Sequence, residues 1–221
     1  MLHTLRSLNL HPKKNQSIDA FFSEKDKNSN FLNLLDLLSI EEIPFSQLSE
    51  TNTPNTSPLI FCIEPNFKSS EIKLERIADD IIYKPLTYEL FSKLINFWSS
   101  SNLIFSDISL KKLASSNGIE IVVKVLNSFN ETLAKSDTEL NLFLKEKDLP
   151  KLSTLAHSLK TSALIVGALA LVDLCEWIEF KNRIQSPLSE KSCSHIKVIF
   201  TNTRQYFREL NKLSIANLIS K

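Results

Sequence analysis

One histidine in this sequence stands among short side chains inside an otherwise apolar, helix-forming stretch. His157 lies in LAHSLKTSALIVGALALVDLCEWIE, which runs from Leu155 to Glu179, and Lys160 follows it by three residues. A neutral imidazole is a nitrogen nucleophile, and a cation one helical turn away offsets the charge of an anion attached to the ring. The spacing therefore predicts a histidine that accepts a phosphoryl group, with Lys160 stabilising the phosphate.

The neighbours of this histidine predict an open approach to the ring. On a helix, residues three and four positions away are neighbours, and here they are small or polar. An apolar residue two turns further on suits a docking patch for a second protein. We expect the following residues to form this docking surface: Ser153, Thr154, Thr161, Leu164 and Gly167. On these residues alone, a surface histidine without a chemical role stays open as an alternative.

The elements that must position the histidine have a clear helical period. Apolar residues recur every three or four positions in four segments, about 119–147, 149–166, 168–182 and 190–213. Asp148 is placed to cap the second segment, Pro150 suits its first turn, and Gly167 suits a left-handed turn at its end. Four amphipathic helices with short connections predict an antiparallel four-helix bundle, preceded by a short helix near 106–115.

The first hundred residues predict a small α/β unit. Segments 57–66 and 79–86 have short β-favouring apolar runs, while 29–39 and 87–98 have the spacing of amphipathic helices. The overall expectation is a mainly α protein with a small N-terminal α/β domain at 1–100 and the four-helix bundle at 101–221.

Composition excludes several classes of function. The 221 residues include only two glycines, so a glycine-rich nucleotide-binding loop cannot be built. A net charge of +1 gives no basis for binding nucleic acid, and the longest apolar run is too short to span a membrane. Three cysteines lack metal-ligand spacing and suit free thiols in the cytoplasm. The start of the sequence lacks the pattern of a signal peptide, and no metal or other cofactor is expected.

The segment around His157 resembles the histidine-phosphotransfer (HPt) domain, whose signature is roughly A-H-x-L-K-G-S-A. The resemblance covers about residues 103 to 217. It rests on these positions: Ala156, His157, Leu159, Lys160, Ser162, Ala163, Gly167, Leu174 and Glu179. It implies a four-helix bundle, phosphorylation of His157 on Nε2, and exchange with receiver domains of response regulators or hybrid histidine kinases. It implies a carrier without an ATP site of its own, and Mg²⁺ would be held by the partner receiver.

Thr161 stands where the HPt signature has glycine, which puts the transfer rate and the choice of partner in question. A threonine there could narrow the approach to the ring or donate its hydroxyl to the phosphate. The functional prediction is a phosphorelay intermediate that accepts a phosphoryl group on His157 from one receiver and passes it to another. The alternative is a non-phosphorylated module that binds or sequesters a receiver.

The N-terminal half is similar to the end of a receiver domain, as expected near the C-terminal end of a hybrid sensor kinase. Segment 57–66 would be the fourth strand, 79–86 the fifth with a Lys84-Pro85 pair, and 87–98 the last helix. No acidic pair lies at the right distance, and Glu64-Pro65 stand where a hydroxyl is expected. This indicates a truncated, degenerate receiver; an unrelated α/β cap on the bundle is the open alternative.

Overall fold

A computed structural model describes residues 33–36, 58–65, 78–99 and 105–210. Contacts between residues divide the chain into two compact units. The first comprises 1–95 with the short segment 186–192, and the second comprises 96–185 with 193–221. The domain bounds 1–100 and 101–221 stay a prediction; the first unit also takes in the segment 186–192, which lies in the predicted bundle.

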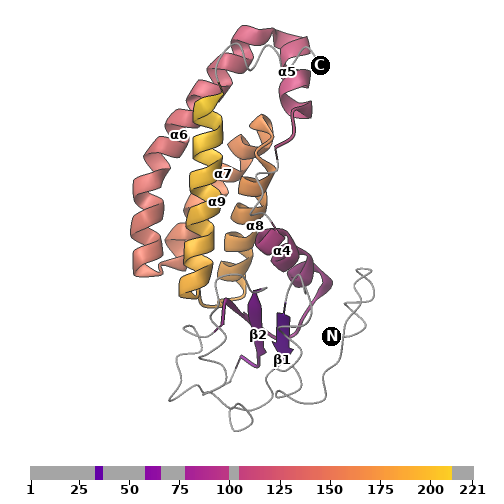
Figure 1. The fold of residues 1–221 in the computed structure, drawn as a ribbon, viewed down its shortest axis with the longest axis vertical. Helices are drawn as coiled ribbons and strands as arrows, with labels where there is room; N and C mark the ends of the chain where they lie inside the picture. Colours follow the sequence, from indigo (N-terminus) through magenta and orange to yellow (C-terminus); the bar gives the residue numbers. More distant parts are fainter. Residues whose placement is uncertain (1–32, 37–57, 66–77, 100–104, 211–221) are drawn as a thin grey trace. The chain divides into compact units, whose positions relative to one another are not determined.

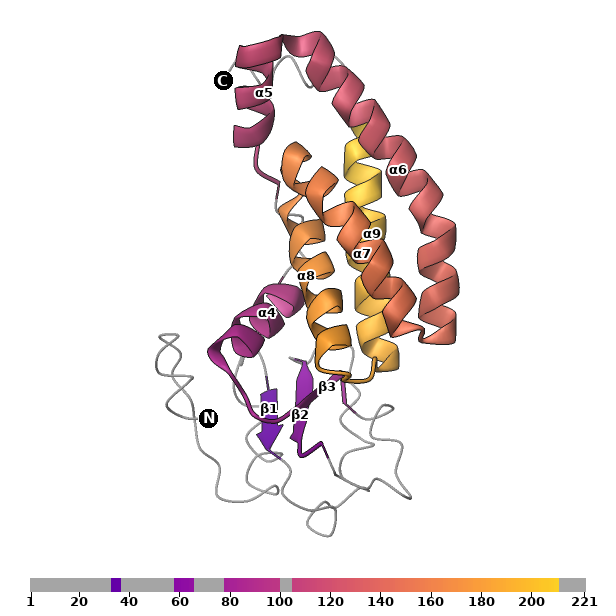
Figure 2. The same cartoon turned by 180° about the vertical axis from the view of Figure 1, so that it is seen from behind.

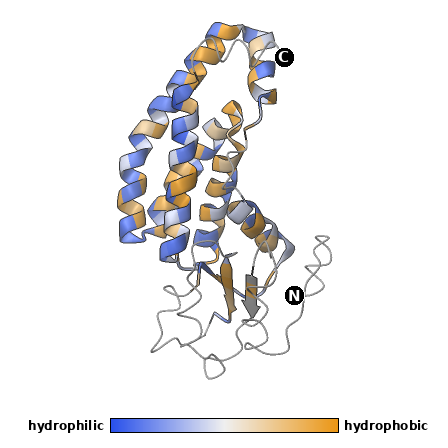
Figure 3. Cartoon of the chain, in the orientation of Figure 1, coloured by the Kyte–Doolittle hydropathy of each residue, from blue (hydrophilic) through white to orange (hydrophobic). Residues whose placement is uncertain are grey.

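Four long helices form the second unit: α6 (Ile119–Glu146), α7 (Leu149–Val166), α8 (Leu169–Arg183) and α9 (Glu190–Glu209). They run up and down in sequence order, as Figures 1 and 2 show, and make the predicted antiparallel four-helix bundle. The shorter α5 (Ile108–Asn117) packs against α6 and α7. Figure 3 shows hydrophobic and hydrophilic residues alternating around α6 and α9, as the periodicity of the sequence requires.

Most of the apolar positions that the sequence assigned to the core of the bundle are buried. On α7, the helix that carries the histidine, the buried residues are Leu149, Leu152, Leu155, Ala156, Leu159, Ala163 and Val166. α6 and α9 are also joined by polar contacts, since Asn130 Nδ2 donates to the Phe207 carbonyl at 3.0 Å and Arg204 pairs with Asp137 at 2.5 Å. The buried residues of α7 form a well-packed inner face, and this face fixes the orientation of the helix.

Both ends of α7 have the caps that the sequence predicts. The Asp148 carboxylate accepts a hydrogen bond of 3.1 Å from the Lys151 backbone N–H, and Pro150 lies in the first turn. Gly167 ends the helix with φ at 76°, in the left-handed region that favours glycine. The helix bounds, and with them the position of His157 along the helix, follow from these local signals.

The first unit contains a three-stranded parallel sheet in the order β1-β2-β3. Its strands are β1 (Asn33–Asp36), β2 (Leu59–Ile63) and β3 (Asp80–Tyr83), and the helix α4 (Tyr88–Ser99) follows. All five residues of β2 are buried, as expected of the central strand of a parallel sheet. The predicted inner face of α4, formed by Leu90, Phe91, Leu94 and Phe97, is also buried.

The helix predicted for 29–39 is wrong in the part that the structure describes. Residues 33–36 form β1, which pairs in parallel with β2 so that Leu34 lies opposite Ile60. A short apolar run does not distinguish a strand from a buried helix by its periodicity, and here the hydrogen-bonding edge of β2 decides in favour of the strand. The rest of the predicted segment lies outside the described residues.

Serine side chains bring the connection between α8 and α9 into the first unit. Ser186 Oγ donates to the Ile81 carbonyl at 2.6 Å, and Ser192 Oγ donates to the Asp79 carbonyl at 3.0 Å. Lys191 pairs with the Asp79 carboxylate at 2.8 Å. Asp79, just before β3, and Ile81 within it are therefore hydrogen-bonded to a segment more than a hundred positions later, which a single boundary near residue 100 does not anticipate.

Within the described ranges, none of the helices is both long and apolar enough to cross a membrane.

Candidate functional site

α7 presents His157 on its exposed face. The side chain of His157 is 80% exposed, and the side chains that surround it on this face, Thr154, Ser158 and Thr161, are short. These positions are three, one and four residues away, so Thr154 and Thr161 are its helical neighbours. The ring is therefore accessible to a large partner.

Glu179 on α8 binds one nitrogen of this ring. Its Oε1 lies 2.8 Å from His157 Nδ1, although 22 residues separate the two in the sequence. An ionised carboxylate can only accept hydrogen bonds, so the proton of this contact belongs to Nδ1. The lone pair of the neutral ring is then on Nε2, the nitrogen that Glu179 leaves free for chemistry.

Lys160 binds the other oxygen of the same carboxylate. Its ammonium group donates to Glu179 Oε2, and the two side chains are only 26% and 23% exposed. Sequence reasoning gave Lys160 a role on the phosphate, and this stays a prediction. The structure adds a second role, because Lys160 orients the carboxylate that in turn orients His157.

The charge on Glu179 depends on these two partners. Partial burial by itself raises the pKa of its carboxyl, but the hydrogen bonds from Lys160 and His157 outweigh this and hold the pKa below its ordinary value. Glu179 is therefore ionised at neutral pH. A fixed negative charge lies against Nδ1 and stabilises any positive charge that develops on the ring.

The hydroxyl groups of α7 differ in what they bind. Thr154 donates to the Pro150 carbonyl at 3.1 Å, Ser158 to Leu155 at 2.7 Å and Ser162 to Leu159 at 2.8 Å. Such bonds to the preceding turn are common for serine and threonine in helices. The Thr161 hydroxyl makes no hydrogen bond with any part of the chain that the structure describes.

Two apolar side chains extend the exposed face toward the end of α7. Leu164, which the sequence predicts to border a docking surface, is 49% exposed, and the adjacent Ile165 is 48% exposed. Thr154 and Thr161 are exposed as expected, while Ser153 is half-buried at the edge of this face. The structure thus brings four of the five predicted docking residues to the same side of α7 as His157.

Gly167 does not belong to this surface. It is buried, its carbonyl accepts a hydrogen bond from the Ser106 backbone N–H at 2.9 Å, and a Cβ at this position would lie 1.9 Å from the Ser106 carbonyl oxygen. Glycine is needed here for the positive φ and for the close passage of the backbone at Ser106. Its role is structural, which corrects the prediction that it contacts a partner.

Sequence reasoning missed the functional role of Glu179, although it included the residue in the family signature. The contact joins two helices, and no spacing within one helix reveals which side chains meet between helices. One signal was present: Glu179 stands between Ile178 and Phe180, which are both buried, and an acid in such surroundings usually has a specific partner. Ile165 was also missed, because a single apolar residue on a helix gives no sign of exposure.

Other chemistry is limited in the described ranges. They contain no group of three or more histidine, cysteine or acidic side chains that could hold a metal ion. Cys175 lies one turn before Glu179 on α8, but burial and the nearby Glu179 charge raise the pKa of its thiol, so it stays protonated and unreactive.

A family model for the Hpt domain matches residues 120–206, from the start of α6 to the last turns of α9. The match contains the whole of α7 and α8, with His157, Lys160 and Glu179. Neither the curated proteins nor the solved structures include a match to this chain.

The fold and the site define a helical bundle built around one exposed histidine. The bundle contains an Hpt domain over residues 120–206, as the HPt resemblance of the residues around His157 indicates. Hpt domains act with receiver domains in two-component phosphorelays, and the bundle has a phosphotransfer role of this kind.

Proposed function

We propose that His157 Nε2 accepts a phosphoryl group from the aspartyl phosphate of one receiver domain and passes it to an aspartate of another. The observation that carries this proposal is that Glu179 binds only one of the two ring nitrogens. Nδ1 is held by Glu179 at 2.8 Å, whereas the side chain as a whole is 80% exposed. This arrangement supports a ring that is fixed in direction and open at Nε2.

The transfer is a substitution at phosphorus. The Nε2 lone pair forms a bond to phosphorus while the bond between phosphorus and the donor aspartate oxygen breaks, and the aspartate leaves as a carboxylate. The ring keeps its Nδ1 proton and gains a positive charge, which the Glu179 carboxylate offsets. In the onward step the N–P bond breaks, and its electron pair returns to Nε2 as a second aspartate attacks. Mg²⁺ would be bound by the receivers, whose acidic oxygens suit it.

The face around His157 suits contact with a folded domain. Its short side chains allow a large donor to bring phosphorus close to Nε2, and Leu164 and Ile165 provide apolar area beside the ring. Ser153, Thr154 and Thr161 complete the proposed docking surface. We place this exchange in the cytoplasm, since the three cysteines of the described residues are not joined by disulfide bonds.

The direct test is transfer of labelled phosphate from a phosphorylated receiver to the full chain. We expect acid-labile, base-stable label on the unmodified protein and none on His157→Gln. His195→Gln is the matched control, because it removes a histidine from the same helical unit and should be labelled normally. Receiver binding without label on the unmodified protein would contradict the proposal and favour the alternative of a sequestering module.

We also propose that the N-terminal unit is a degenerate receiver that takes no phosphate. Three parallel strands in sequence order followed by α4 are compatible with the last strands and helix of the doubly wound 2-1-3-4-5 sheet. Lys84 at the end of β3 pairs with Glu64 after β2 at 3.3 Å. Glu64, which stands at the position where a working receiver has a hydroxyl residue, thus forms an ion pair with Lys84. A small-molecule phosphodonor such as acetyl phosphate should leave His157→Gln unlabelled, and acid-stable or aspartyl label on it would contradict this assignment.

A further inference from the structure

The Thr161 hydroxyl is the feature of this face that the function described so far does not use. Thr161 is exposed, and its hydroxyl makes no hydrogen bond within the described part of the chain. By contrast, the hydroxyls of Thr154, Ser158 and Ser162 are each bound to a backbone carbonyl. A donor that is not engaged by its own helix can serve a ligand without losing an existing bond.

Helix geometry places Thr161 on the opposite side of His157 from Glu179. With about 100° between successive residues, Lys160 lies roughly 60° to one side of His157 and Thr161 roughly 40° to the other. Because Lys160 and His157 Nδ1 share the Glu179 carboxylate, the Lys160 side is the side to which Nδ1 turns. Nε2 is the nitrogen further from that carboxylate, so the Thr161 side is the one nearer to it.

The other hydroxyls near His157 do not combine these properties. Ser153 lies roughly 40° to the Lys160 side of His157 and is half-buried. Thr154 lies roughly 60° to the Thr161 side, but its hydroxyl donates to the Pro150 carbonyl. Thr161 is therefore the described helical neighbour of His157 that has a free donor on the Nε2 side.

The charges at the site favour a neutral donor such as the Thr161 hydroxyl for the phosphoryl group. The Lys160 ammonium is bound to Glu179 while the ring is unphosphorylated. If it moved to the phosphoryl group, Glu179 would lose the partner that helps to keep its pKa low. A neutral hydroxyl can bind a phosphoryl oxygen without disturbing the pair that holds Nδ1.

We propose that the Thr161 hydroxyl donates a hydrogen bond to an oxygen of the phosphoryl group as it moves onto and off His157 Nε2. The inference rests on the phosphotransfer function proposed above and adds a residue that contacts the transferred group. The bond is strongest in the transition state, when phosphorus lies between the aspartate oxygen and Nε2, so it lowers the barrier in both directions. Thr161, which stands where the signature has glycine, then also selects among receivers. A donor receiver must place its phosphorus within reach of the Thr161 hydroxyl.

The test compares four variants of the full chain in phosphotransfer from a phosphorylated receiver. Thr161→Val keeps the shape and removes the hydroxyl, Thr161→Ser keeps the hydroxyl, and Thr161→Gly restores the signature residue. Thr132→Val on α6 is the matched control, since its hydroxyl is bound to the Ser128 carbonyl at 2.9 Å and it is not among the proposed docking residues. We expect Thr161→Val and Thr161→Gly to slow transfer roughly fivefold to tenfold, the size of one hydrogen bond. Thr161→Ser should recover most of the rate that Thr161→Val loses, and Thr132→Val should stay within about twofold of the unmodified protein.

Affinity for the unphosphorylated receiver is the second readout, and in each Thr161 variant it should change less than the transfer rate does. Label on His157 with equal rates for Thr161→Val and the unmodified protein would overturn this inference alone. Faster transfer by Thr161→Gly would also overturn it, because the threonine would then be an obstacle. No label on the unmodified protein would overturn the phosphotransfer proposal and this inference together.

Discussion

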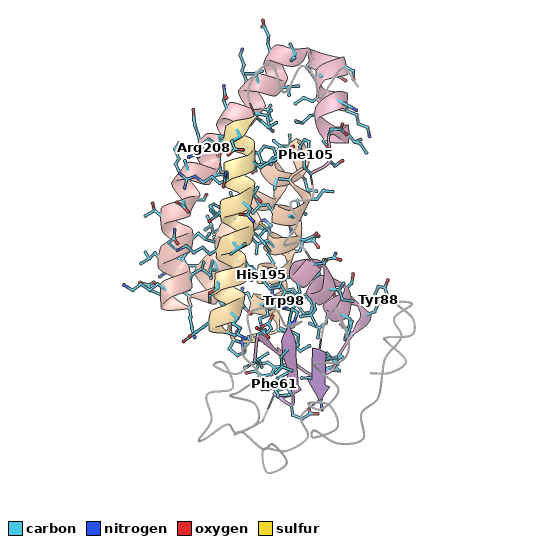
Figure 4. The ribbon with its side chains drawn as sticks, viewed as in Figure 1. Phe61, Tyr88, Trp98, Phe105, His195 and Arg208 are labelled. Atoms are coloured by element: carbon cyan, nitrogen blue, oxygen red, sulfur yellow. The ribbon has the colours of Figure 1, made fainter. Side chains whose placement is uncertain are left out.

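Two histidines of the helical unit lie in opposite surroundings. His157 on α7 is 80% exposed, and Glu179 holds its Nδ1. His195 on α9 is partly buried, its Nε2 donates to the Phe97 carbonyl at 3.0 Å, and its ring stacks on Trp98 with 4.7 Å between centroids. Figure 4 shows the labelled His195 and Trp98 side by side.

The difference shows what makes one of these histidines suited to chemistry. Both rings are fixed in direction by a hydrogen bond, so fixation alone does not separate them. At His195 the fixed nitrogen is Nε2 itself, and Phe97 packs edge-on against the ring at 4.8 Å between centroids. At His157 the bond is to Nδ1 and the acceptor is a charge, so the ring is held, its positive form is stabilised, and Nε2 is left to react.

Removing the charge beside His157 should have the largest effect on the rate of phosphotransfer. Glu179→Ala removes the acceptor and the charge, and we expect transfer to fall on the order of 100-fold, the contribution of a well-placed acid or base group. Glu179→Gln keeps an acceptor and loses the charge, so a loss of about 10-fold is expected. Initial rates of label transfer from a phosphorylated receiver measure both. Equal rates for the unmodified protein and Glu179→Ala would mean that the hydrogen bond from Nδ1 to Glu179 does not contribute to transfer.

Changing His195 should have the reverse outcome. His195→Gln loses ring stacking and alters the hydrogen bond to Phe97, so we expect the free energy of unfolding to fall by about 1–2 kcal/mol. Transfer to His157 should remain within about twofold. Urea unfolding together with the transfer assay separates the two effects. A large loss of transfer in a stable His195→Gln protein would show that the two sites are not independent.

Acid titration gives the smallest expected effect, and its sign follows from Glu179. Because the folded-state pKa of this carboxyl lies below its ordinary value of 4.5, its contribution to stability is fully present above that value. The contribution is lost as pH falls through the lower folded-state pKa. The stability difference between the unmodified protein and Glu179→Gln, about 0.5–1 kcal/mol for a partly exposed pair, should thus shrink as pH falls below 4.5. A difference that grew as pH fell below 4.5 would contradict this sign.

Much of the helical unit could be predicted from the sequence, because its signals are local. The inner faces of α6 to α9 follow from periodicity, and Asp148, Pro150 and Gly167 define the ends of α7. His157 could be identified because its distinguishing neighbours lie on the same helix. The docking role predicted for Gly167 failed because exposure depends on Ser106, which lies on a preceding segment.

What could not be predicted depends on contacts between distant segments. The bond from Glu179 to His157 joins two helices, and the bond from Ser186 to the Ile81 carbonyl spans 105 residues. Neither leaves a periodic pattern in the sequence. The helix prediction for 29–39 failed for the same reason. The four residues of β1 form a strand because β2 provides an edge with which they pair.

The central claim is that Glu179 holds Nδ1 so that Nε2 of His157 carries the phosphoryl group. The most direct test is nitrogen and phosphorus NMR of the full chain with labelled histidine, before and after phosphorylation by a receiver. We expect the proton of the neutral His157 ring on Nδ1 and, after transfer, a phosphorus–nitrogen coupling at Nε2. Phosphorus on Nδ1, or a neutral ring with its proton on Nε2, would contradict it.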